Sequence, residues 1–194
     1  MTHVSIIGSG NMGQAISSVV AKGGNTVELF NSTDKDKPAT GDVVILAVPY
    51  PAIDQVLAER GDQLAGKVVV DISNPLNFET FDSLVVAADG SAAAELAEKL
   101  PDSKVLKAFN TTFAATVASG QAGQDSTTVP TTVLIAGDDA DAKAQFAGIV
   151  SAGGLKAVDA GALKRARELE AIGFLQLTLA VGEKVSWTGG FGLV

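Results

Sequence analysis

Three glycines near the start of the chain have the spacing of a dinucleotide-binding turn. They follow the apolar run "HVSII" and precede a helical pattern at residues 11–23. In this setting the first glycine permits a tight turn, the second lets the backbone approach a pyrophosphate, and the third allows the helix to pack closely on the strand. The N–H groups at the start of the helix then point at the anion. The predicted contacts are Gly8, Ser9, Gly10, Asn11, Met12 and Gly13. The alternative is a glycine turn without a ligand.

The residues after the second predicted strand indicate which dinucleotide would bind. An NAD site usually has an acidic residue there for the ribose 2′-hydroxyl, whereas this chain has Asn31, Ser32 and Thr33. Hydroxyl groups accept a 2′-phosphate that a carboxylate would repel, and Lys35 and Lys37 can supply positive charge. We therefore predict that NADP(H) is preferred to NAD(H), and that Lys37→Ala weakens NADP binding. The alternative is a polar turn whose charges are solvated.

Strand and helix patterns alternate along the chain. Strand patterns lie at 3–7, 26–30, 43–48, 67–72, 104–108, 132–136 and 155–159, and helical patterns at 11–23, 52–60, 91–100, 139–151 and 162–184. This alternation predicts an α/β fold of the Rossmann type, with a doubly wound parallel sheet.

Two segments between these patterns have unusual lengths. Residues 31–41 are too few for a helix and a strand, so we expect a shortened connection after the second strand and no outer third strand. Residues 73–90 form a long irregular run at the carboxyl end of a strand, where ligands of open α/β sheets bind. We divide the chain into an NADP-binding domain, residues 1–160, and a small helical C-terminal segment with a tail, residues 161–194.

Composition narrows the classes of function. The net charge of −8 over 194 residues argues against a nucleic-acid partner. The chain has no cysteine and a single histidine, His3, so we expect neither thiolate catalysis, a Ser-His-Asp triad nor a metal site. The apolar stretches are too short to span a bilayer and no signal-peptide pattern is present, so we expect no membrane partner and a cytoplasmic protein.

Seven motifs in sequence order resemble one known family. They are "GSGNMG", "NSTDKDK", "ILAVPY", "DISNPLNF", "KAFNT", "IAGDDADAK" and "DAGALKRARELE". Together they resemble the F420-dependent NADP oxidoreductases over most of the chain. The resemblance implies a Rossmann domain with a small helical C-terminal part, NADP(H) as cofactor and a homodimer. It also implies hydride transfer to or from a small-molecule acceptor, the deazaflavin F420 or a flavin. The oxidoreductase domains of membrane ferric reductases are similar, with a flavin as acceptor.

The resemblance also assigns further site residues. The family's Ser-Arg-(x)n-Lys pattern after strand two maps onto Ser32, Thr33 and Lys37, with threonine in place of arginine. The segment "AVP" would line the adenosine side, and "NP" and "AFN" would approach the nicotinamide end. The residues so implied are Ala47, Val48, Pro49, Asn74, Pro75, Ala108 and Asn110.

No side chain is assigned as catalytic, because hydride transfer between flat rings depends mainly on positioning. A reductase of a small carbonyl or imine would need a proton donor, and Tyr50 and Lys107 are the candidates. Tyr50 can equally pack on the adenosine side. We interpret Lys107 and the charged run 164–170 as solvated faces. A third hypothesis is a non-enzymatic NADP(H) sensor. Trp187 and Phe191 either line the acceptor pocket or hold the C-terminal tail in place.

Overall fold

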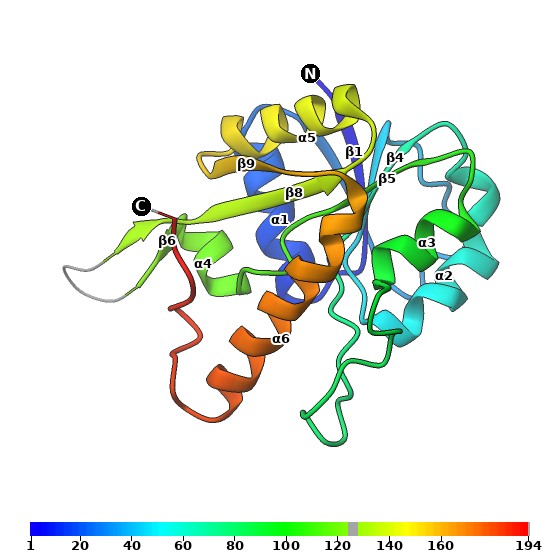
Figure 1. Cartoon of the computed structure of the whole chain (residues 1–194). Helices are drawn as coiled ribbons and strands as arrows, with labels where there is room; N and C mark the ends of the chain where they lie inside the picture. The colour runs from blue at the N-terminus through cyan, green and yellow to red at the C-terminus, as the bar shows by residue number, and fades with distance from the viewer. Residues whose placement is uncertain (124–127, 194) are drawn as a thin grey trace.

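A single central sheet with helices on both faces makes up most of the chain (Figure 1). The computed structural model describes residues 1–123 and 128–193. Seven strands pair in the order β2-β1-β3-β4-β5-β8-β9. Their bounds are β1 His3–Ile7, β2 Thr26–Phe30, β3 Val43–Leu46, β4 Val68–Asp71, β5 Lys104–Lys107, β8 Thr132–Gly137 and β9 Lys156–Gly161. The predicted Rossmann-type α/β fold is confirmed.

The direction of two strands, β8 and its parallel neighbour β9, differs from the expectation of a fully parallel sheet. Strands β2, β1, β3, β4 and β5 are parallel, but β8 pairs with β5 antiparallel, through Leu106–Gly137 and Lys107–Ala136. Between β5 and β8 the chain forms the short helix α4 (Ala114–Ser119) and the small antiparallel pair β6 (Gln121–Ala122) and β7 (Val129–Pro130). A parallel neighbour needs a crossover over the sheet, and this connection turns the chain back instead.

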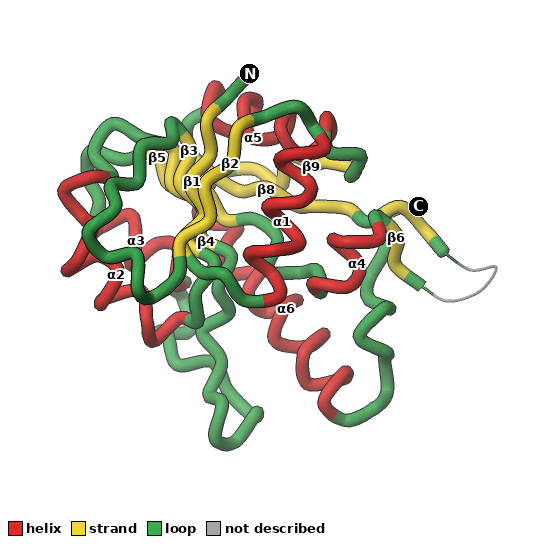
Figure 2. Tube along the Cα trace, turned by 180° about the vertical axis from the view of Figure 1, so that it is seen from behind, coloured by secondary structure: helices red, strands yellow, loops and turns green. Residues whose placement is uncertain are grey.

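The helices form two layers, which Figure 2 shows from behind. One apolar core joins the sheet to α1 (Asn11–Lys22), α4 and α5 (Ala140–Ala152), and a second joins it to α2 (Ile53–Arg60), α3 (Ala92–Lys99) and the start of α6 (Ala166–Val181). Three short 3-10 segments complete the described helices: η1 Tyr50–Ala52, η2 Gly61–Gln63 and η4 Leu163–Arg165. None of these helices is long and apolar enough to cross a membrane.

Local sequence signals explain where several elements begin and end. Ser91 caps α3 by accepting a hydrogen bond from Ala94 N at 3.1 Å, and Asp139 caps α5 in the same way at Ala142 N, 2.8 Å. Strand β3 ends at Leu46 rather than at residue 48, shortly before Pro49, which has no N–H to donate. The predicted helix at 162–184 is a 3-10 turn followed by α6.

The short connection after β2 has the expected effect on the sheet. Among the described strands β2 pairs only with β1, so the sheet has no outer third strand and β2 is its edge. The carboxyl ends of β1, β3, β4 and β5 meet the N-terminus of α1 at one edge, and α6 and the loop 73–90 extend beyond that edge in Figure 1. The division of the chain at residue 160 stays a prediction.

Candidate functional site

The turn between β1 and α1 has the geometry that a diphosphate requires. Gly8 has φ +117°, and a Cβ there would lie 2.1 Å from Ala47 O; at Gly13 it would lie 1.9 Å from Gly8 O. A Cβ on Gly10 would instead meet nothing within 4 Å. Gly10 is the N-cap of α1 and provides no side-chain cap, so the first N–H groups of the helix are available to an anion. The residues present therefore fit the pyrophosphate of a dinucleotide.

A first cavity of about 260 Å³ lies on one side of this turn. Six residues that the sequence analysis assigned to cofactor binding line it: Gly8, Ser9, Asn31, Ser32, Lys35 and Val48. Thr33 and Lys37 are not in its lining; Lys37 is 71% exposed and pairs with Asp34 at 2.5 Å. The two lysines therefore differ in position: Lys35 borders the first cavity, where a ribose 2′-phosphate would lie, and Lys37 does not.

The turn after β2 is held by its own side chains. Asn31 Oδ1 accepts hydrogen bonds from Thr33 N at 2.7 Å and Thr33 Oγ1 at 2.6 Å, and Asp34 Oδ2 accepts one from Asn31 N at 3.0 Å. The backbone N–H of Asn31 and the Lys37 ammonium lower the pKa of the Asp34 carboxyl. Asn31 and Thr33 therefore act on the shape of the turn as well as on its polarity.

Arg60 at the end of α2 also lines the first cavity, and the sequence analysis did not assign it to the site. Its side chain is buried, lies over the Phe30 ring at 4.9 Å, and donates to the carbonyl oxygens of Asp34 and of Lys37, the latter at 2.5 Å. It lines the first cavity together with Glu59, whose carboxylate pairs with Lys35 Nζ at 2.6 Å. The helical pattern at 52–60 places Arg60 at its last position, but nothing there shows that the arginine reaches back to a loop.

A second cavity of about 410 Å³ lies on the other side of the glycine turn. Met12 and Asn74 border it, and Trp187 packs against Phe113 at 4.9 Å on its far wall. The full lining is Asn11, Met12, Ile72, Asn74, Phe109, Asn110, Thr112, Phe113, Ala114, Ala115, Leu177 and Trp187. Of the two aromatic residues left open above, Trp187 walls this cavity, and Phe191 lines a separate apolar one beside α6.

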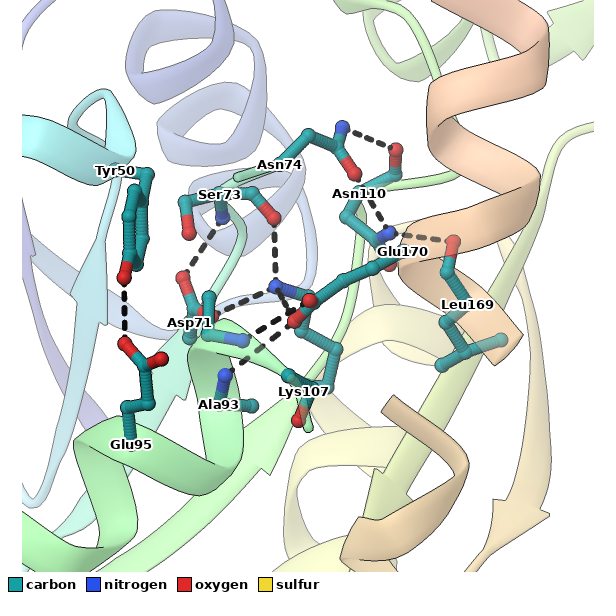
Figure 3. A network of polar contacts seen from close by, with 12 residues as sticks. Tyr50, Asp71, Ser73, Asn74, Ala93, Glu95, Lys107, Asn110, Leu169 and Glu170 are labelled. Carbon is teal, nitrogen blue, oxygen red and sulfur yellow. Dashed lines mark hydrogen bonds and ion pairs between the residues drawn. The ribbon is translucent and has the colours of Figure 1, made fainter. Parts of the chain in front are cut away.

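Asn74 and Asn110 lie side by side, just beyond the carboxyl ends of β4 and β5 (Figure 3). Asn74 Nδ2 donates to Asn110 O at 2.9 Å, and Asn110 Nδ2 donates to Asn74 Oδ1 at 3.0 Å and to Leu169 O at 2.8 Å. Helix α6 approaches this pair at Gly173, where a Cβ would lie 2.3 Å from Asn74 Oδ1. A glycine inside an apolar helix is the sequence signal that could have indicated so close an approach.

The interpretation of Lys107 as a solvated residue is wrong. The side chain has no exposed surface, and Nζ contacts Asp71 Oδ2 at 2.7 Å, Glu170 Oε1 at 2.8 Å and Ser73 O at 2.6 Å (Figure 3). β5 is a central strand covered on both faces, so a lysine on it must be buried and paired. We call Lys107, Asp71 and Glu170 the Lys107 cluster, and none of the three is among the described residues that line the second cavity.

The interpretation of the charged run 164–170 as a solvated face is correct for only some of its residues. Arg167 and Lys164 are exposed, but Glu170 is fully buried and accepts hydrogen bonds from Ala92 N at 2.9 Å and Ala93 N at 3.3 Å, at the start of α3. Burial raises the pKa of the Glu170 carboxyl, and the Lys107 ammonium opposes that shift. Glu170 therefore joins α6 to α3 and β5.

Tyr50 and His3 lie outside both cavities. The Tyr50 hydroxyl donates to Glu95 Oε2 at 2.5 Å, and burial followed by the Glu95 carboxylate raises its pKa. The residue borders a small hollow between η1 and α3. His3 begins β1 at the opposite end from the glycine turn and lies 3.4 Å from Glu28.

The remaining predicted residues support the backbone around the cavities. Ala47 N donates to Ile7 O at 2.7 Å, and Pro49 precedes η1. Pro75 is buried, and its carbonyl accepts from Val85 N at 2.8 Å. Ala108 is fully buried in the first core, so its side chain is not available to a ligand.

Comparison with known proteins relates the chain to NADP oxidoreductases. A family model described as NADP oxidoreductase, coenzyme F420-dependent, matches residues 26–75. The chain is 30% identical over 175 residues to the F420-dependent NADP reductase of Methanocaldococcus jannaschii, a match that covers 88% of this chain and 76% of that protein. It is also 32% identical over 184 residues to the metalloreductase STEAP3 of Rattus norvegicus, covering 87% of this chain and 36% of that protein.

A crystal structure from Arthrobacter sp. FB24, described as a candidate F420-dependent NADP reductase, has the same fold. The two chains superpose with a TM-score of 0.85 and 23% sequence identity, and the match covers 100% of each.

Proposed function

The chain belongs to the family of coenzyme F420-dependent NADP oxidoreductases, and we propose that it transfers hydride between NADP(H) and a planar deazaflavin or flavin ring. Membership of the family makes it an NADP-dependent oxidoreductase; the identity of the acceptor is the proposal. The homodimer that the family resemblance implies stays a prediction.

The observation that carries the proposal is the lining of the second cavity. None of the described residues there is an acid, a base or a tyrosine. Reduction of a carbonyl or an imine needs a proton donor within hydrogen-bond reach of the substrate. Tyr50 borders a different hollow, and Lys107 is enclosed with its two carboxylates. The cavity is therefore suited to a reaction that depends on the stacking of two rings and not on a protein acid.

The two cavities would hold the two ends of the dinucleotide. The glycine turn and α1 would bind the pyrophosphate, the first cavity the adenosine, and the second cavity the nicotinamide. When bound, NADPH supplies the hydride, which the acceptor takes up with a proton from water, leaving NADP⁺. Met12 and Asn74 would border the nicotinamide, and Trp187 would offer its ring face to the acceptor. Half of the Trp187 surface is exposed, which leaves that side of the cavity open to an incoming ring.

Absorbance of NADPH tests the acceptor class directly. We expect oxidation of NADPH with F420, riboflavin or flavin mononucleotide to exceed that with a panel of small carbonyls and imines. Tyr50→Phe should leave the flavin or F420 rate within about twofold, since its hydroxyl lies outside the second cavity. A carbonyl or imine that reacts faster than every flat ring, with turnover abolished by Tyr50→Phe, would overturn the proposal. Tight NADP binding without turnover of any acceptor would favour a sensor.

Lys35 is expected to distinguish NADP from NAD. Lys35→Ala should weaken NADP binding about tenfold, because one charge-assisted hydrogen bond contributes about 1.5 kcal/mol, and should leave NAD binding unchanged. The change also leaves the Glu59 carboxylate without its cationic partner in the first cavity, where its charge repels a phosphate. Titration calorimetry with both cofactors measures this. Lys37→Ala is the matched control and should have a smaller effect, since Lys37 does not line the cavity. An equal loss of NADP and NAD affinity in Lys35→Ala would contradict the assignment.

A further inference from the structure

The second cavity is small for the two ring systems that the proposed function would bring together. Its volume is about 410 Å³, whereas pockets for a single small ligand span about 300–1,000 Å³. Hydride transfer requires the reacting atoms of the nicotinamide and the acceptor ring to lie about 3–3.5 Å apart, so both rings must occupy this space at once. One wall of the cavity therefore has to move outwards when the acceptor enters.

Most walls of the second cavity belong to elements that are fixed in the body of the protein. Met12 on α1 and Ile72 after β4 pack in the first apolar core, and α4 packs in the same core. Leu177 lies on α6, whose start packs in the second core. Among the described lining residues, Trp187 alone comes from the C-terminal tail, as we call residues 182–193.

The C-terminal tail is held to the body less firmly than these elements. All of its residues are exposed or only partly buried, and Trp187 is 51% exposed. Gly123 N donates to Thr188 O at 2.9 Å. Further along the tail, Phe191 N donates to the side chain of Gln176 on α6, at 3.2 Å from Oε1. A segment that buries so little surface opens more readily than the core of the protein.

The turn at the end of α6 and two glycines beyond it provide points about which the tail can move. Lys184 N donates to Leu179 O at 2.8 Å, and Glu183 has φ 56°, a left-handed conformation that is strained for a residue other than glycine. The glycines at 189–190, which tolerate many backbone conformations, follow shortly after Trp187. Figure 1 shows the tail (red) running from this turn back towards β6. The segment that bears Trp187 thus lies between two hinge points.

We propose that the C-terminal tail is a hinged wall, which moves outwards to admit a flat aromatic acceptor and returns so that Trp187 stacks on the outer face of that ring. This inference rests on the proposed function, since it requires the acceptor to react in the second cavity. Trp187 now contacts Phe113, at 4.9 Å and a ring angle of 59°, which is neither the offset-stacked nor the edge-to-face geometry that aromatic pairs prefer. A flat acceptor offers a parallel face instead, whereas a small carbonyl compound offers none. The tail therefore selects the acceptor by its shape.

An engineered disulfide can hold the tail in place, because the chain has no cysteine of its own. A Cβ on Gly192 would lie 3.6 Å from the Cβ of Val129 on β7, within the range of about 3.5–4.5 Å that a disulfide requires. In Val129→Cys/Gly192→Cys, oxidation of NADPH by riboflavin should be about tenfold slower in the disulfide form than after reduction. The affinity for NADP⁺ should be the same in both forms. Absorbance of NADPH and titration calorimetry measure the two quantities.

The two forms of this variant separate the possible failures. Equal rates in the disulfide and reduced forms would overturn the hinged wall and leave the proposed function standing. A reduced form that oxidises NADPH with no flat ring would overturn the proposed function itself. Val129→Cys alone, oxidised in the same way, is the matched control: it cannot form the internal disulfide and should keep the rate of its own reduced form.

Trp187 is the sole tryptophan of the chain, so its fluorescence tests the stacking in the unmodified protein and serves if the double variant does not fold. Riboflavin added to the NADP⁺ complex should quench this fluorescence, after correction for the light that riboflavin absorbs. Trp187→Ala should raise the KM for riboflavin about fivefold, the value of one aromatic pair, and leave the affinity for NADP⁺ unchanged. Trp187→Tyr, which keeps a ring, should restore most of the KM. Unquenched fluorescence, or an equal loss of NADP⁺ affinity in Trp187→Ala, would overturn the inference.

Discussion

Replacing Gly10 with valine is expected to weaken NADP binding on the order of 100-fold, with the loss of two charge-assisted hydrogen bonds to phosphate. A Cβ on Gly10 meets no protein atom within 4 Å, and the residue has φ −68° and ψ −177°, which valine can adopt. The valine side chain would therefore fill the space of the pyrophosphate without disturbing the fold. The free energy of unfolding should fall by less than about 1 kcal/mol, the range of N-cap effects. Calorimetry with NADP and urea denaturation measure the two quantities.

Gly148→Val is the matched control for this experiment. Gly148 also has no atom within 4 Å of an added Cβ, but it lies on the exposed side of α5. This variant should bind NADP with wild-type affinity and be no less stable, since glycine is a poor residue inside a helix. If Gly10→Val bound NADP as tightly as this control, the phosphate would not lie at the glycine turn, and the assignment of both cavities would fail with it.

Lys107→Met is expected to lower the free energy of unfolding by about 3–5 kcal/mol, the cost of leaving buried charges without their partner. Methionine fills most of the same volume, so the effect is electrostatic. It leaves Asp71 and Glu170 facing each other with no exposed surface. Urea denaturation at pH 7 measures the loss. Lys104→Met, on the same strand, is the matched control: Lys104 is half exposed, its ion pair with Asp139 is 3.1 Å long, and its loss should cost at most about 1 kcal/mol.

The loss of stability in Lys107→Met should also depend on pH, and should become smaller as the pH falls. Burial already raises the pKa of Glu170 in the wild type, and without the Lys107 ammonium only the hydrogen bond from Ala92 N opposes that shift. The folded variant then holds a proton that the unfolded chain has released, between the ordinary pKa of a glutamate and the raised value. Stability of the variant therefore rises as the pH falls through this window. The difference from wild type should be smaller at pH 5 than at pH 7; an unchanged difference would mean that the two carboxyls do not carry the penalty.

Much of the fold and the glycine turn could be predicted because their signals are local. The seven strand patterns, the capping residues Ser91 and Asp139 and the spacing of the three glycines each depend on a few adjacent residues. The missing third strand followed from the length of the segment 31–41 alone. The reversed strand β8 shows the limit of such reasoning, because the residue pattern of a strand is the same whichever way the strand runs.

The parts of the site that escaped prediction depend on contacts between distant segments. Lys107 looks like the last residue of an ordinary strand, and its ion pair with Glu170 forms only because α6 packs beside the end of that strand. Arg60 becomes part of the site because it reaches the loop after β2. The side chain of Asn110 bonds to Asn74 and Leu169, which lie far from it in the sequence. Pairings of this kind are set by packing, which a single sequence does not show.

The absence of an outer third strand has a consequence for how the molecule behaves in concentrated solution. Strand β2 ends the sheet, so its outer backbone groups could template strands from other chains, the usual first step of edge-to-edge aggregation. Glu28 places a charged side chain at the centre of this five-residue strand. At the opposite border, β9 carries the charged residues Lys156 and Asp159. Its pairing with β8 also shifts register between Ile135 and Ala136 of β8, and such a bulge bends an edge strand. Each border of the sheet thus has a charge or a kink that opposes further strand addition, and Glu28→Val would be expected to raise the tendency of the protein to form β-rich aggregates.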